Sequence, residues 1–156
     1  MQNVFSEIAL NNIDVSLQTI EGITDNEQFE ELQIIIPTSI HNAVHSLVDF
    51  YERLDKSSLQ PEEDELFRAF MYVNNQLKHD KDLQFVTYNI AEKRYPYFYP
   101  FRYGPPGVCW ADFVDNGSQN ARGKRRHYEQ LLMDKDVQET LESVRGIILR
   151  LKGEKQ

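Results

Sequence analysis

The sequence predicts a mainly α-helical bundle of about four long helices, with a small β-hairpin-like insert at about residues 83–113, in a single domain covering residues 1–156. Apolar residues recur at spacings of three and four over long segments, which is the period of an amphipathic helix. Glycine and proline are sparse, at 7 and 6 residues, and most of them lie between residues 96 and 123. A chain of 156 residues that is 40% hydrophobic can bury one core of ordinary size.

Two helices are expected in the first third of the chain. The first covers residues 4–20, and Gly22 is a plausible end for it. The second covers residues 27–55, and we expect Pro37 to kink it because the apolar period continues on both sides. Its apolar stripe consists of Ile40, Val44, Leu47, Tyr51 and Leu54.

Two further helices are expected on either side of the insert. The third runs from Pro61 to about residue 81, with Pro61 in its first turn and Ser58 or Gln60 before it. Four acidic residues at 62–65 suit the positive end of that helix. A last long helix is predicted over residues 120–152, where apolar residues again recur at helical spacing.

The insert has the period of extended chain. Residues 83–88 resemble a strand, and aromatic residues alternate over 95–103. Prolines within this run predict an edge strand or an extended arm, and residues 108–113 are expected to return beside it. Five exposed aromatic rings would form a large apolar patch, so we expect them to pack against a helix or a partner.

Charge is distributed unevenly along the chain. Residues 1–65 carry 14 acidic and 2 basic residues, whereas residues 66–156 carry 11 acidic and 15 basic residues. The net charge is −8, and an acidic surface repels nucleic acid. A contact with RNA or DNA would therefore have to use the C-terminal half.

Several classes of protein are not expected. The first residues show no basic segment followed by an apolar one, and no apolar run is long enough to span a membrane. The single cysteine, Cys109, excludes an internal disulfide framework and a multi-cysteine zinc site. The chain also lacks a phosphate-binding glycine loop and a dinucleotide fingerprint. We therefore expect a cytoplasmic protein with no membrane contact, no cofactor and no metal.

A polar seam follows the third predicted helix. Arg68, Tyr72, Asn75 and His79 are spaced by 4, 3 and 4 residues, which places them in one narrow sector. A histidine with an asparagine one turn earlier can bind a phosphate or exchange protons with a ribose hydroxyl. The same spacing also suits a set of hydrogen bonds between packed helices.

The segment FMYVNNQLKHD at residues 70–80 resembles the signature of the HEPN superfamily. The resemblance extends over about residues 27–150, because an extended aromatic- and proline-rich stretch with Trp110 and a final helix follow the motif. It implies a small α-helical bundle that often dimerises with two motif helices facing each other. Many members are metal-independent RNases of toxin–antitoxin or abortive-infection systems.

The motif departs from the nuclease pattern at one central position. Asn74 stands where the family's nucleases have arginine, so the resemblance places the candidate catalytic positions at Asn74, Asn75 and His79. Arg68 lies 11 residues before His79, about 16 Å away along a helix. Lys81 stands where toxins silenced by a paired nucleotidyltransferase carry tyrosine.

Other candidate binding residues are basic or lie near aromatic residues. The candidates for contact with RNA or a partner are Arg68, Tyr72, Lys78, Arg102, Arg122, Lys124, Arg125 and Arg126. Arg102 lies among tyrosines that could stack on bases or pack subunits together. The cluster at 122–126 could meet phosphate or an acidic helix, including the acidic first half of this chain. His41 and His45 have the i, i+4 spacing of metal ligands, but a solvated helix edge is the better explanation for them.

These observations favour a HEPN-like, non-catalytic, homodimeric protein that binds a cognate protein or RNA partner, in a defence or toxin–antitoxin context. One alternative is a metal-independent RNase centred on His79. The other is a protein-interaction module unrelated to nucleic acid.

Overall fold

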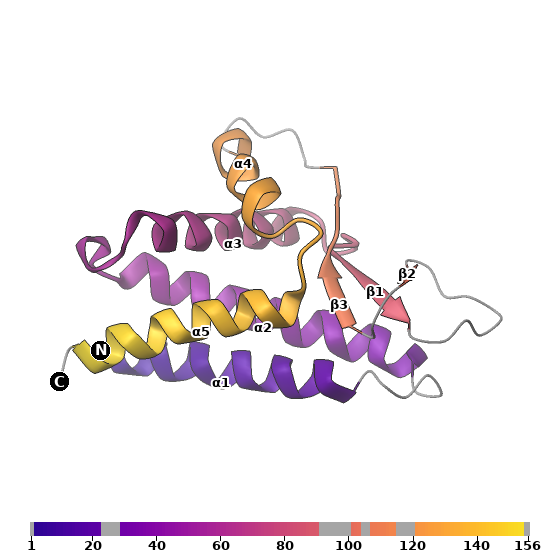
Figure 1. Ribbon diagram of the computed structural model, residues 1–156, viewed down its shortest axis with the longest axis horizontal. Helices are drawn as coiled ribbons and strands as arrows, with labels where there is room; N and C mark the ends of the chain where they lie inside the picture. The colour runs from indigo at the N-terminus through magenta and orange to yellow at the C-terminus, as the bar shows by residue number, and fades with distance from the viewer. Residues whose placement is uncertain (1, 23–28, 91–100, 104–106, 115–120, 155–156) are drawn as a thin grey trace.

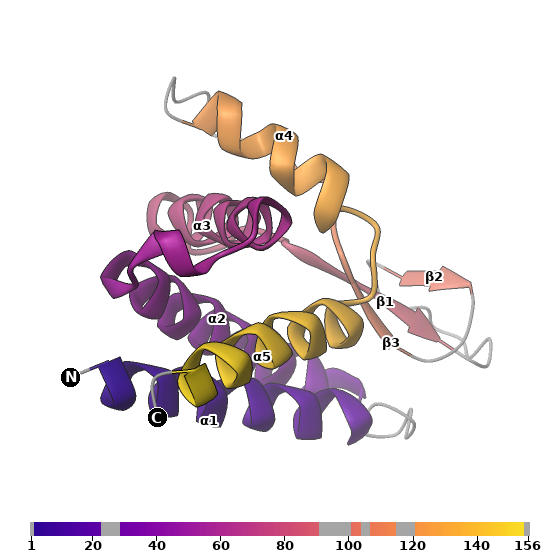
Figure 2. The ribbon, with the colours of Figure 1, turned by 60° about the vertical axis from the view of Figure 1, so that its left-hand side comes forward.

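The computed structural model describes residues 2–22, 29–90, 101–103, 107–114 and 121–154, and it has the predicted mainly α-helical fold with a small β element. Four long helices lie side by side along the length of the molecule, and the sheet lies at one end of them (Figure 1). The long helices are α1 (Gln2–Glu21), α2 (Phe29–Arg53), α3 (Pro61–His79) and α5 (Val137–Glu154). A single 3-10 turn, η3 (Lys56–Ser58), joins α2 to α3, and the short helix α4 (Ala121–Leu131) packs outside α3 (Figure 2).

The helix boundaries follow local signals in the sequence. α2 continues through Pro37, as the unbroken apolar period predicted, and the Thr38 hydroxyl donates to the Ile34 carbonyl beside it. α3 begins with Pro61 in its first turn, and Gln60 is its N-cap. The Glu63 carboxylate accepts a 2.8 Å hydrogen bond from the Gln60 amide, which satisfies a donor that the helix leaves unpaired.

The sheet has three strands in the order β2–β1–β3, formed by β2 (Phe101–Tyr103), β1 (Val86–Ile90) and β3 (Gly107–Trp110). β1 and β3 are antiparallel, with Val86 opposite Trp110, and they form the expected hairpin-like element. The predicted pairing of 108–113 with the aromatic run was wrong, because β1 lies between β2 and β3 and runs parallel to β2. The tyrosines at 95, 97 and 99 lie outside the described residues.

The expected single helix over 120–152 is divided into α4 and α5 by a turn at 132–136. Asp134 adopts a positive φ of 66° in this turn, which ends the helical path. The turn pairs with β3, because the backbone amide of Trp110 donates to the Lys135 carbonyl and the Asp134 amide donates to the Trp110 carbonyl. Asp136 then caps α5 by accepting from the Glu139 amide at 3.1 Å.

The core is continuous from the bundle into the sheet. Trp110 is completely buried, and its ring meets Phe70 of α3 edge-on at 5.7 Å. Its indole Nε1–H donates to the Thr140 hydroxyl at 2.8 Å, which attaches β3 to the first turn of α5. None of the described helices is long and apolar enough to cross a membrane.

Candidate functional site

The polar seam of α3 does not form one surface. Tyr72 is completely buried, whereas Arg68 and His79 are exposed and Asn75 is half-buried. The difference arises because α4 and Phe113, in the segment after β3, cover the middle of α3 (Figure 2). Tyr72 is therefore a packing residue, and its side chain is not available to RNA or to a partner.

Arg125 of α4 is held against Tyr72 by several contacts. One guanidinium nitrogen donates to the Tyr72 hydroxyl at 2.7 Å and to the Phe113 carbonyl at 2.8 Å. Its Nε donates to Glu129 at 2.8 Å, and Asp112 lies 3.4 Å from the remaining nitrogen. Burial alone would lower the pKa of Arg125, but the bonds to Tyr72 and Glu129 raise it overall. This predicted binding residue is therefore a structural cation that joins α4 to α3.

Aromatic rings complete the same junction. Phe113 stacks on Tyr72 with ring centroids 5.8 Å apart, and Tyr128 lies 5.1 Å from Phe113. The Tyr128 hydroxyl donates to the Ala111 carbonyl. Burial raises the pKa of Tyr128 far above its ordinary value, so the phenol stays neutral and acts as a donor. The rings of this junction are buried against one another, which suits packing rather than recognition.

Asn74 is also buried, with 2% of its surface exposed. Its side-chain oxygen, Oδ1, has no hydrogen-bond partner among the described residues. HEPN nucleases, which the motif resembles, have arginine at the position of Asn74, and this position is buried in the present protein. An arginine at this position would have to reach solvent or find an acceptor, because a buried unpaired charge is costly.

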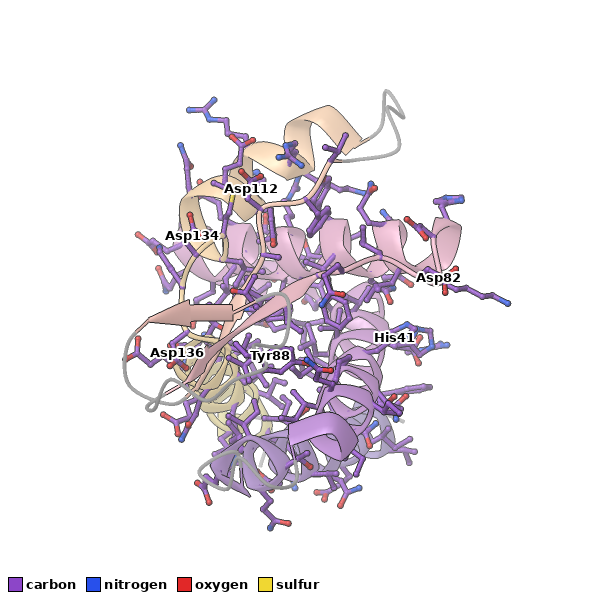
Figure 3. All side chains as sticks on the ribbon, turned by 90° about the vertical axis from the view of Figure 1, so that its right-hand side faces the viewer. His41, Asp82, Tyr88, Asp112, Asp134 and Asp136 are labelled. Atoms are coloured by element: carbon purple, nitrogen blue, oxygen red, sulfur yellow. The ribbon has the colours of Figure 1, made fainter. Side chains whose placement is uncertain are left out.

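The C-terminal end of α3 is the open part of the predicted site. His79 and Lys78 are exposed, and within the described part of the chain neither forms an ion pair. A hollow of about 260 Å³ lies beside this end, lined by His41 of α2 and by Lys81 and Asp82 of the following turn. His41 and Asp82 lie on one side of the molecule (Figure 3). His79 itself is not part of the hollow's lining.

His41 and His45 form an exposed pair on α2. Burial and the neighbouring His45 lower the pKa of His41, so His41 is neutral at physiological pH more readily than an isolated histidine. Across the described residues, no group of three histidine, cysteine, aspartate or glutamate side chains could hold a metal ion. Two imidazoles alone do not complete a tetrahedral site.

Arg68 is committed to an ion pair within α3. Its Nε lies 2.8 Å from Asp64, and Asp64 also accepts a hydrogen bond from the Tyr51 hydroxyl of α2. Burial and the bond to Asp64 raise the pKa of Tyr51 to about 12. Arg68 therefore helps to join α3 to α2, far along the helix from His79.

The basic cluster on α4 is only partly accessible. Arg126 is exposed, Lys124 is half-buried and Arg125 is bound to the protein itself. The side chains of Arg122, on α4, and Arg102, on β2, lie outside the described residues. The bond from Arg125 to Glu129 shows that acidic side chains of the same helix neutralise part of this cluster.

Sequence reasoning missed an exposed apolar surface on α1 and α2. Val15 of α1 and Ile34 and Ile35 of α2 line a hollow of about 310 Å³ there, and Ile34 is 73% exposed. Two signals could have revealed it: Val4, Ile8 and Val15 recur away from the buried stripe of α1, and residues 32–48 contain no Asp, Glu, Lys or Arg.

Comparison with known proteins gives no relative: no family model, curated protein or solved structure matches this chain.

Proposed function

We propose that this chain is a HEPN-like, non-catalytic protein of the cytoplasm that dimerises and binds a protein partner, in a defence or toxin–antitoxin setting. The observation that carries the proposal is the burial of Asn74. In the HEPN nucleases that the motif resembles, the residue at this position is the arginine that neutralises the scissile phosphate. Without that charge, the electrostatic contribution that usually dominates such catalysis is missing.

Three other cations of the structure are poor replacements for that arginine. Arg68 is paired with Asp64, and Arg125 is bound to Tyr72 and Phe113. Lys78 is exposed next to His79, but lysine is a point charge without the bidentate geometry of a guanidinium. The arrangement at the end of α3 therefore favours an inert imidazole over a nuclease centre.

A protein partner fits the surface better than RNA does. The chain has a net charge of −8, and several of its arginines are engaged in internal ion pairs. Phosphate contacts supply most of the affinity for nucleic acid and require free cations. In contrast, the exposed apolar residues on α1 and α2 are typical of a protein-binding surface.

The RNase alternative is kept because His79 is exposed. We would incubate the protein with mixed RNAs in the presence of a chelator and compare it with His79→Ala. The matched control is His45→Ala, which removes another exposed helical imidazole. We expect no cleavage by any of the three proteins and no RNA retention on a filter at physiological salt.

Cleavage that is lost in His79→Ala and kept in His45→Ala would replace the proposal with the RNase alternative. Tight RNA binding without cleavage would keep the non-catalytic part and change the partner from protein to RNA. The mass of the protein in solution tests the dimer, and a monomer at tens of micromolar would contradict it.

A further inference from the structure

The outer side of α1 and α2 forms an exposed apolar face, which we call the α1–α2 face. Five of the seven large apolar side chains that are exposed in the described part of the chain lie on it. They are Val4, Ile8, Val15, Ile34 and Ile35, each at least 46% exposed. In two views α1 forms one edge of the bundle (Figures 1 and 2).

The face has both a stripe and a hollow. At 100° per residue, Val4, Ile8 and Val15 fall within a sector of about 40° on α1. The hollow of about 310 Å³ lies between this stripe and α2, and Asn12, Thr19 and Asn42 add neutral polar groups to its lining. Ile34 borders the hollow and is the most exposed of the five apolar side chains, so the face contains a protrusion beside a recess.

The middle of the α1–α2 face is uncharged although the protein is acidic, whereas at the Val4 end the exposed Asp49–Arg53 pair of α2 lies beside Phe5 of α1. The acidic residues Glu7 and Asp14 of α1 form ion pairs with Lys152 and Arg145 of α5, on another side of the helix. On α2, residues 32–48 include no Asp, Glu, Lys or Arg. Depletion of charge with exposed aliphatic side chains is typical of the centre of a protein–protein interface.

We propose that the occupant of this face is a second copy of the same chain, in a two-fold arrangement that uses the same face of both copies. This inference rests on the proposed function, because it names the surface through which the protein dimerises. Two copies with a net charge of −8 each repel at most of their surface, but the middle of this face brings no like charges together. A protrusion beside a recess is self-complementary, as an isologous interface requires.

The size of the face is sufficient for a dimer. α1 has 20 residues and is about 30 Å long, so two adjacent helices about 10 Å wide present about 600 Å² per copy. The pair would bury about 1,200 Å² in total, the lower end of the range for specific interfaces. A dimer of moderate affinity is expected, and its dissociation should be measurable by dilution.

The test is sedimentation equilibrium of the full chain over a range of concentrations. Ile34→Glu places two like charges in the interface, and we expect its dissociation constant to rise at least a hundredfold. Leu149→Glu is the matched control, because Leu149 is 42% exposed on α5 and lies outside the face. It should dimerise like the unaltered protein.

Ile8→Glu is a second variant on the other helix of the face, and it should weaken the dimer in the same direction. Circular dichroism and urea midpoints establish that each variant is folded before its mass is interpreted. A dimer that is equally stable in both face variants would overturn this inference and leave the proposed dimeric function intact, with another surface as its interface. A monomer of the unaltered protein at all concentrations would overturn both.

Discussion

Replacing Thr140 by valine should weaken the attachment of β3 to α5. The buried indole N–H of Trp110 donates to the Thr140 hydroxyl at 2.8 Å, and valine keeps the volume of the side chain while removing this acceptor. A buried donor that loses its partner costs about 1–3 kcal/mol. For a protein of this size, each kcal/mol corresponds to about 2–4 °C, so the melting temperature should fall by about 2–12 °C.

The assay uses the fact that Trp110 is the single tryptophan of the chain. Urea unfolding followed by its fluorescence gives the free energy of unfolding, and its one indole N–H resonance reports hydrogen exchange at the bond itself. Thr140→Ser is the control, because it keeps the hydroxyl and loses one methyl group, worth about 0.8 kcal/mol. Indole exchange should accelerate in Thr140→Val and stay slow in Thr140→Ser.

The reasoning would be refuted if Thr140→Val were as stable as the unaltered protein and its indole N–H exchanged no faster. Such a result would mean that the first turn of α5 does not satisfy Trp110. The hydrogen bond between Trp110 and Thr140 would then not contribute to holding the start of α5 against β3.

Three further predictions concern the helix junctions. Arg125→Met should lower the free energy of unfolding, measured in urea, by about 2–3 kcal/mol, because the substitution removes the donors to the buried Tyr72 hydroxyl and to the Phe113 carbonyl. Arg126→Met is the control at an exposed position, and its free energy of unfolding should change by no more than about 0.5 kcal/mol. Equal effects of the two substitutions would contradict this prediction. Burial raises the pKa of Asp64, but hydrogen bonds from Tyr51 and Arg68 outweigh burial, so the pKa of Asp64 is lowered overall. Asp64→Asn should therefore destabilise the protein above about pH 4, and this loss of stability should disappear as the pH falls through the folded-state pKa of Asp64. A stability difference that does not change with pH would contradict this prediction. Asn74→Arg should lower the melting temperature without creating RNA cleavage, because it places a guanidinium at a buried position. A variant that is as stable as the unaltered protein and cleaves RNA would contradict this prediction.

Local sequence signals were sufficient to predict the class of fold and the approximate limits of α1, α2 and α3. Apolar spacing and start signals are local, so they identified α1, α2 and α3, including the N-terminal turn at Pro61, whereas the structure selects Gln60 over Ser58 as the N-cap. The same local reasoning missed the turn at 132–136, although Asp136 followed by Glu139 has the spacing of a helix cap and could have indicated a new start.

Which residues of α3 are accessible depends on contacts between helices, and local sequence signals do not reveal those contacts. The spacing of Tyr72, Asn75 and His79 predicts one shared sector, but exposure depends on what packs over that sector. α4 and Phe113 cover Tyr72, while the end of the helix at His79 stays open. Likewise, helical spacing marks apolar stripes on α1 and α2 without showing which one the bundle buries. Burial depends on contacts between elements far apart in the chain, and periodicity within one helix carries no information about them.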